Sequence, residues 1–300
     1  MKVRVKVPAT SANMGPGFDT LGVALNLYNK IEVEETDSGL EIVSLNAGGY
    51  IPRDERNLIY RAIKMVFDCV GYKEKGLKIT QDSEIPMTRG LGSSSACIVG
   101  GMLCANVISG RKLSYAEIIN LAARMEGHPD NVGPALYGGF CVSLMESDVT
   151  IVKSVKIDSR VRFALMIPDY FVATKQSRDV LPEKVSFKDA VYNVSHASML
   201  QAAFVSGDTQ CLKYGVKDRL HQQYRKSYIE NMEDIFSKTY SLGSCATYLS
   251  GSGPTILSIL DGNYHEFEEG MKKYFKDNSH KWNCKIVEIN NVGSVVCVMD

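Results

Sequence analysis

Apolar residues alternate with charged residues at the start of the chain. Valines stand at positions 3, 5 and 7 among arginine and lysine side chains, and Pro8 follows them. A period of two residues is typical of a strand with one buried face, and we expect Pro8 to end this strand. Segments 28–35 and 39–45 repeat the alternation and are predicted to be strands as well.

Helical spacing takes over in the next part of the chain. From residue 54 to residue 70 the apolar positions share one face, which predicts an amphipathic helix. Residues 96–109 are apolar on nearly every side, so we expect a buried helix there. Ser114 and Glu117 have the spacing of a capping box and predict a helix that ends at Glu126, before a glycine.

The remaining elements suggest a second half with its own strands and helices. Strands are expected at 77–86, 138–144, 149–157, 161–168, 247–260 with an internal turn, 284–289 and 294–299. A helix before Gly207 is expected to bury Val191, Val194, Ala197, Met199 and Leu200, and further helices are expected at 228–241 and around Phe267, Met271, Tyr274 and Phe275. Strands and helices come in runs, which favours an α+β fold over a doubly wound parallel sheet. A length of 300 residues favours two lobes, which we place at 1–155 and 156–300.

Charge and cysteine usage exclude several classes of protein. The 34 basic and 34 acidic side chains cancel, so no overall field attracts nucleic acid or an anionic membrane. The eight cysteines show no metal-ligand spacing and lie mostly in apolar runs, as expected for reduced thiols in a cytoplasmic protein. The chain begins with charged residues and contains no run of about 18 apolar residues, so we expect neither export nor a membrane span.

A glycine-serine segment, "MTRGLGSSSA" at 87–96, precedes the predicted buried helix. The chain has no Gly-Lys dipeptide, which excludes the Walker motif, and Ser95 stands where the dinucleotide fingerprint requires a third glycine. A glycine-rich turn at a helix N-terminus still offers unpaired amides to a phosphate. Serine hydroxyls can donate to oxygen atoms or coordinate a metal. A plain turn and helix cap is the alternative interpretation.

Three other segments combine polar side chains with glycines. Residues 8–22 are expected to form a long loop with Asn13 and Asp19, shaped for a small polar molecule or serving only as a turn. At 125–140, His128 follows the end of a helix at Glu126, a carboxylate suited to Mg²⁺, although a histidine there is commonly a structural cap. Residues 249–259 contain a second glycine turn, which by itself is a weak signal.

Together these segments resemble those of the GHMP kinases, the family that phosphorylates galactose, homoserine, mevalonate and phosphomevalonate. "PMTRGLGSSSA" is similar to the family's phosphate loop, and the N-terminal and late glycine-rich segments appear in the family's order. Segments 8–22 and 126–140 are most similar to those of members that act on homoserine. The resemblance implies an N-terminal lobe like domain two of ribosomal protein S5, a ferredoxin-like C-terminal lobe, and an active site between them.

The resemblance also implies residue roles. ATP is expected to bind Asn57 and the loop residues Pro86, Met87, Thr88, Arg89, Gly90, Leu91, Gly92, Ser93, Ser94 and Ser95. Mg²⁺ is expected at Glu126 and at Ser94 or Ser95. Homoserine is expected to contact Asn13, Asp19, His128, Thr174, Arg178, Arg225, Gly251, Ser252 and Gly253, with Asp19 accepting from its ammonium group and the two arginines binding its carboxylate.

The resemblance favours direct in-line phosphoryl transfer. Asn131 stands where some members carry an aspartate base, and an amide cannot take a proton at neutral pH. We therefore expect Asn131 to orient the hydroxyl, with Asp130 as the rival base. The implied product is O-phospho-L-homoserine, an intermediate of threonine synthesis, and the implied assembly is a homodimer. The alternatives are a related alcohol kinase, such as one for mevalonate, and a sensor that binds without turnover.

Overall fold

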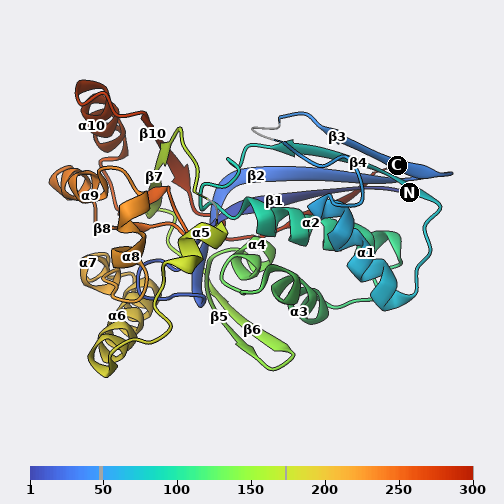
Figure 1. Cartoon of the computed structure of the whole chain (residues 1–300), viewed down its shortest axis with the longest axis horizontal. Coiled ribbons are helices and arrows are strands. Elements are labelled where there is room, and N and C mark those ends of the chain that lie inside the picture. The colour runs from blue at the N-terminus through green and yellow to red at the C-terminus, as the bar shows by residue number, and fades with distance from the viewer. Residues whose placement is uncertain (47–49, 173, 300) are drawn as a thin grey trace.

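The first lobe is built on a large, mostly antiparallel sheet (Figure 1). The computed structural model describes residues 1–46, 50–172 and 174–299, with the side chains of Thr174 and Lys175 left out. Among these residues, one sheet follows the order β11-β1-β2-β4-β3, and the hairpin β5–β6 branches from β2. Its strands are β1 (Lys2–Ala12), β2 (Leu21–Thr36), β3 (Gly39–Ser44), β4 (Gly76–Ser83), β5 (Phe140–Glu146), β6 (Val149–Val155) and β11 (Val295–Met299).

Four helices pack on one side of this sheet (Figure 1). They are α1 (Leu58–Val70), α2 (Ser93–Ile108), α3 (Tyr115–Glu126) and α4 (Val132–Tyr137). Helix α2 lies against β1 and β2 and is buried from Ser95 to Ile108 apart from the half-buried Cys97, as its apolar sequence predicts. The predicted capping box of α3 is present, with Ser114 and Glu117 each accepting from the other's backbone amide. These elements bring the start of α2 and the end of α3 to the side of the lobe that faces the second lobe.

The second lobe has a smaller sheet in the order β10-β7-β9-β8. Its strands are β7 (Arg162–Pro168), β8 (Ala246–Leu249), β9 (Ile256–Leu260) and β10 (Trp282–Glu288). Its helical elements are α5 (Thr174–Asp179), α6 (Phe187–Ser206), α7 (Leu212–Gly215), α8 (Gln222–Arg225), a 3₁₀ turn (Lys226–Tyr228), α9 (Met232–Ser241) and α10 (Tyr264–Asp277). No helix among the described residues is long and apolar enough to span a bilayer. The two-lobed α+β architecture agrees with the prediction.

The first strand does not end at Pro8. Strand β1 continues to Ala12, and its register with β2 shifts between Pro8 and Ala9. Proline lacks an amide proton, and a register irregularity is a position where a sheet tolerates this loss. The expected loop over 8–22 is therefore only the stretch 13–20, and its first residues belong to the sheet.

Helix α6 exists where it was predicted, but its buried face is different. It buries Asn193, Leu200, Ala203 and Phe204. Val191, Val194 and Met199 are exposed, so the predicted apolar face was wrong at these three positions. The helix mixes apolar residues around its circumference, and helical spacing alone could not identify the side that packs on the protein.

The last strand returns to the first lobe. Strand β11 pairs antiparallel with β1, with Lys2 opposite Met299. Both termini accordingly lie together at the end of the large sheet that points away from the second lobe (Figure 1). The change from one sheet to the other falls between β6 and β7, next to the predicted boundary at 155. The segment 294–299 was expected to belong to the second lobe, but it lies in the sheet of the first lobe.

Candidate active site

A cavity of about 270 Å³ lies where the two lobes meet. Twenty of the predicted site residues line it: Asn13, Asp19, Asn57, Pro86, Met87, Thr88, Arg89, Gly90, Leu91, Gly92, Ser93, Ser94, Glu126, His128, Asp130, Asn131, Arg178, Arg225, Gly251 and Ser252. Three others do not appear in its wall. Ser95 lies buried behind it, Gly253 faces Ile229 and Leu249 in the second lobe, and the side chain of Thr174 is outside the described part of the structure.

The glycine-serine loop enters α2 through a left-handed turn. Gly92, the residue before the helix, has φ +70°, and no side chain among the described residues caps the first amides of α2. The loop also approaches other backbone closely, since a Cβ on Gly90 would lie 2.3 Å from the Ser250 carbonyl oxygen. A long helix with uncapped N-terminal amides facing a cavity is suited to bind phosphate oxygens.

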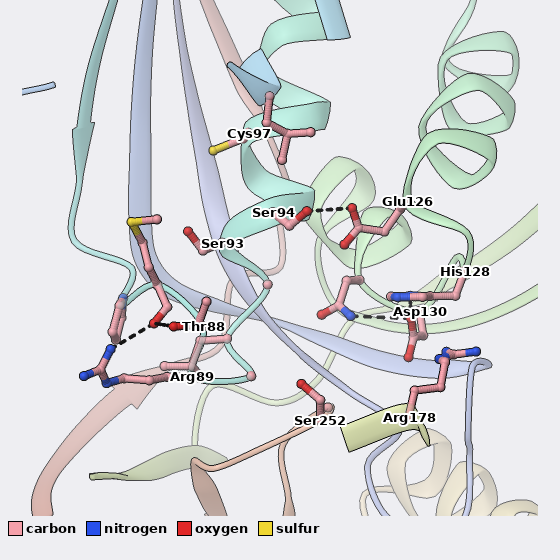
Figure 2. Close-up of a pocket in the computed structure, with 18 of the residues that line it drawn as sticks. Thr88, Arg89, Ser93, Ser94, Cys97, Glu126, His128, Asp130, Arg178 and Ser252 are labelled. Atoms are coloured by element: carbon pink, nitrogen blue, oxygen red, sulfur yellow. Dashed lines mark hydrogen bonds and ion pairs between the residues drawn. The ribbon is translucent and has the colours of Figure 1, made fainter. Parts of the chain in front are cut away.

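Two serines of this loop point to one carboxylate. The hydroxyls of Ser94 and Ser95 donate to Glu126 over 2.8 and 3.0 Å. Figure 2 shows Ser94 at the start of α2 facing Glu126 at the end of α3. Ser94 is exposed in the cavity wall, whereas Ser95 is fully buried. A carboxylate with a facing hydroxyl is the hard oxygen donor set that Mg²⁺ prefers, so these residues fit the metal that the sequence predicts.

A chain of hydrogen-bonded polar groups around the buried Asp130 follows Glu126. His128 Nδ1 lies 2.6 Å from Asp130 Oδ1, and the Asn131 amide donates weakly to the same oxygen over 3.4 Å. Thr10 donates to Asn131 Oδ1 over 2.8 Å, which fixes the orientation of the amide. Burial alone would lower the pKa of His128, but the hydrogen bond to Asp130 and the charges of Asp130, Glu126 and Asp19 outweigh it and raise this pKa above its ordinary value. Asp130 is therefore engaged with its neighbours (Figure 2).

Asp19 and Arg178, which are expected to bind opposite ends of the substrate, contact each other. Arg178 Nη2 donates to Asp19 Oδ1 over 2.6 Å, so the expected ammonium acceptor and the expected carboxylate donor form an ion pair with each other. Both side chains are partly exposed, at 45% for Arg178 and 32% for Asp19. Both groups line the cavity, where a zwitterionic amino acid would offer each of them an opposite charge in exchange.

Arg225 is a buried cation at the same end of the cavity. Only 2% of its surface is exposed, and it donates from Nε to Ser177 O at 3.0 Å and from Nη1 to Gly251 O at 2.9 Å. Burial, followed by the positive charge of Arg178, lowers the pKa of Arg225 to about 10. A substrate carboxylate would oppose both effects, which fits the predicted role.

Arg89 and Asn57 line the cavity but use their polar groups to hold the protein together. The Arg89 guanidinium donates to the carbonyls of Met87, Pro168 and Asp169 over 2.9, 3.2 and 2.8 Å. Figure 2 shows Arg89 directed away from Ser94 and Glu126. Asn57 caps α1 through Oδ1 and donates from Nδ2 to Pro52 O. Neither interaction was expected from the sequence.

Seven lining residues were missed: Tyr50, Ile51, Pro52, Leu58, Ile59, Gln81 and Cys97. Cys97 lies one turn after Ser93 and Ser94, so helical spacing could have identified it. Its sulfur accepts from Gln81 over 3.5 Å, and burial raises the pKa of the thiol to about 12, which keeps it neutral. Residues 50–52 carry no motif, and only the fold brings them to the cavity.

The fold and the site define a class of small-molecule kinases with two lobes and a glycine-serine phosphate loop. The chain belongs to the GHMP kinase family, since the model described as the GHMP kinases N terminal domain matches residues 57–139 and the one described as GHMP kinases C terminal matches residues 196–277.

The chain is similar to homoserine kinases over nearly its whole length. It is 43% identical to one from Clostridium beijerinckii, with 98% of each protein covered. It is 46% identical to one from Caldicellulosiruptor saccharolyticus, with 98% of this chain and 96% of the relative covered. The crystal structure of a homoserine kinase from Cytophaga hutchinsonii superposes with a TM-score of 0.90 at 27% identity, over 99% of this chain and 97% of the other.

Proposed function

We propose that this protein transfers the γ-phosphoryl group of ATP to the side-chain hydroxyl of L-homoserine. The observation that carries the proposal is the two-ended cavity. At one end the phosphate loop meets Glu126, and at the other end Asp19, Arg178 and Arg225 offer opposite charges to an amino acid. O-phospho-L-homoserine, an intermediate of threonine biosynthesis, and ADP are the products.

The phosphate loop is proposed to bind the ATP phosphates through the first amides of α2, with Mg²⁺ held by Glu126 and Ser94. The metal, when bound, screens charge on the phosphate oxygens. Ser94 is the favoured hydroxyl because it lines the cavity, whereas the buried Ser95 fixes the position of the Glu126 carboxylate.

Direct transfer is the proposed mechanism. The homoserine hydroxyl oxygen attacks the γ-phosphorus, the bond from that phosphorus to the ADP oxygen breaks, and the hydroxyl proton passes to a phosphate oxygen. Asn131 orients the hydroxyl with its amide N–H, since Thr10 already occupies its Oδ1. Asp130 holds His128 and Asn131 in place.

A coupled assay of ADP release with a panel of alcohols tests the proposal. We expect turnover with L-homoserine and less than about one hundredth of its kcat/KM with mevalonate or galactose, because charged hydrogen bonds from two arginines are worth roughly 1.5–3 kcal/mol each. Mass spectrometry of the product should show phosphate on the side-chain oxygen. Preference for mevalonate would replace the proposal with the related alcohol kinase, and nucleotide binding without turnover would replace it with the sensor.

We also propose that the protein is a cytoplasmic homodimer. All eight cysteines are free thiols in the structure, which suits a reducing compartment. The dimer rests on the family resemblance, and light scattering of the purified protein tests it.

A further inference from the structure

His221 is a fully buried histidine with no place in the reaction described above. It precedes α8 and has no exposed surface. Its Nδ1 lies 3.1 Å from Arg225 Nη1, and its Nε2 lies 2.7 Å from the carbonyl oxygen of Gly15. One imidazole therefore connects the arginine of the amino-acid end of the cavity with the loop 13–20 that carries Asp19.

The partners of His221 determine its protonation. A guanidinium has only donors, so the Nδ1 that faces Arg225 must be an acceptor and carries no proton. The proton is then on Nε2, which donates to Gly15 O. Burial lowers the pKa of His221 below its ordinary value despite the nearby charges of Asp218 and Asp19, and the charge of Arg225 lowers it further, so the neutral form agrees with the contacts.

The segment that carries His221 is fixed by a buried aspartate. Asp218 accepts from the amides of Leu220, His221 and Gln222 over 2.9, 2.9 and 2.7 Å, and from the Asn193 side chain over 2.8 Å. These contacts use both carboxylate oxygens. His221 consequently has a defined position relative to α8, and its Nδ1 is presented to Arg225.

We propose that His221 is a positioning residue for the substrate carboxylate: by accepting from Arg225 Nη1 it fixes the guanidinium so that Nη2 is presented to the cavity. Nε and Nη1 are committed to Ser177, Gly251 and His221, and Nη2 has no hydrogen-bond partner among the described residues. Without the imidazole acceptor, only the Ser177 and Gly251 carbonyls hold the guanidinium, so the orientation of Nη2 is less restricted. The inference rests on the proposed function, because it takes the carboxylate of homoserine as the ligand of Arg225.

A double-mutant cycle tests this role. His221→Gln keeps a donor at the ε position for Gly15 and removes the δ acceptor for Arg225, and Arg225→Met removes the guanidinium but keeps its stem. We expect His221→Gln alone to raise the KM for homoserine about tenfold, the effect of one charged hydrogen bond, with kcat and the KM for ATP within about twofold. In the Arg225→Met background the same change should alter the KM for homoserine less than about twofold.

Two further variants keep the test decisive. His221→Asn, which retains an acceptor at the δ position, should recover most of the affinity lost in His221→Gln. His196→Gln, a change on the outer helix α6 away from the cavity, serves as the matched control and should leave all kinetic parameters unchanged. Equal effects of His221→Gln with and without Arg225, or a parallel loss in both KM values and kcat, would overturn the inference. Absence of homoserine turnover in the unaltered protein would instead overturn the proposed function.

Discussion

Glu126 and Asp130 are carboxylates four residues apart that hold different groups. Glu126 accepts from two loop serines, whereas Asp130 is buried against His128 and Asn131. We expect Glu126→Gln to lower kcat by roughly 10²–10³-fold, because it removes the charge that would hold the metal at the phosphates. Asp130→Asn should lower kcat less than about tenfold, since the amide oxygen can still accept from His128.

Steady-state kinetics at saturating ATP and homoserine distinguish the two carboxylates. If Asp130 were the general base, its replacement would reduce kcat by roughly 10²–10⁴-fold, and the direct-transfer mechanism would be wrong. Asp148→Asn provides a control, because that carboxylate is exposed on the β5–β6 turn.

The sequence identified most of the residues around the cavity, but several of their contacts could not be predicted. Asp19 and Arg178 are 159 residues apart and pair directly, which depends on how the two lobes meet. Arg89 belongs to the predicted loop, yet its donors are used by carbonyls of the other lobe. A motif indicates which residues gather at a site. The tertiary structure determines which of their polar groups already have hydrogen-bond partners within the protein.

The start of α2 is the element on which phosphate binding depends, and Gly92 is its tightest point. A Cβ at this position would lie 1.9 Å from Thr10 Oγ1, and φ is +70°. We expect Gly92→Ala to lower the free energy of unfolding by roughly 1–2 kcal/mol for the left-handed backbone and about 1–3 kcal/mol more for the clash. It should also lower kcat, because Thr10 is the residue that orients Asn131.

Gly71 offers a matched control for Gly92. It ends α1 with φ +68°, and an added Cβ would meet nothing within 4 Å. Gly71→Ala should show only the backbone effect of roughly 1–2 kcal/mol in urea unfolding and normal turnover. Equal losses of stability in the two variants would show that the contact between the loop and β1 is not tight.

At the level of elements, local signals were reliable where they were strong. The capping box predicted helix α3, and the all-round apolar sequence predicted both helix α2 and its burial. The sequence of helix α6 has no comparable signal for its buried face. Its buried Asn193 is held by hydrogen bonds to Asp218 and to the Pro16 carbonyl rather than by apolar packing. Strand β1 passes Pro8 because β2 supplies a partner for the whole strand, which local pattern could not reveal.

The whole molecule is joined by segments that cross between the lobes. Strand β11 follows the last strand of the second lobe and pairs with β1, so the large sheet is complete only when the chain end has returned. No local pattern distinguishes β11 from an edge strand of the second sheet. Both ends of the chain therefore belong to the first lobe, and the cavity lies where the two lobes meet.

Arg89 is one of the side chains that tie the phosphate loop to the second lobe, through the Pro168 and Asp169 carbonyls at the end of β7. We expect Arg89→Met to raise the KM for ATP roughly tenfold, because the loop must then be ordered by the nucleotide itself, and to lower the melting temperature. Arg160→Met, which removes an exposed pair with Asp158, should change neither quantity. An unchanged KM for ATP would show that the loop is held without Arg89, and a hundredfold loss of kcat at unchanged KM would place the guanidinium on the transferred phosphate instead.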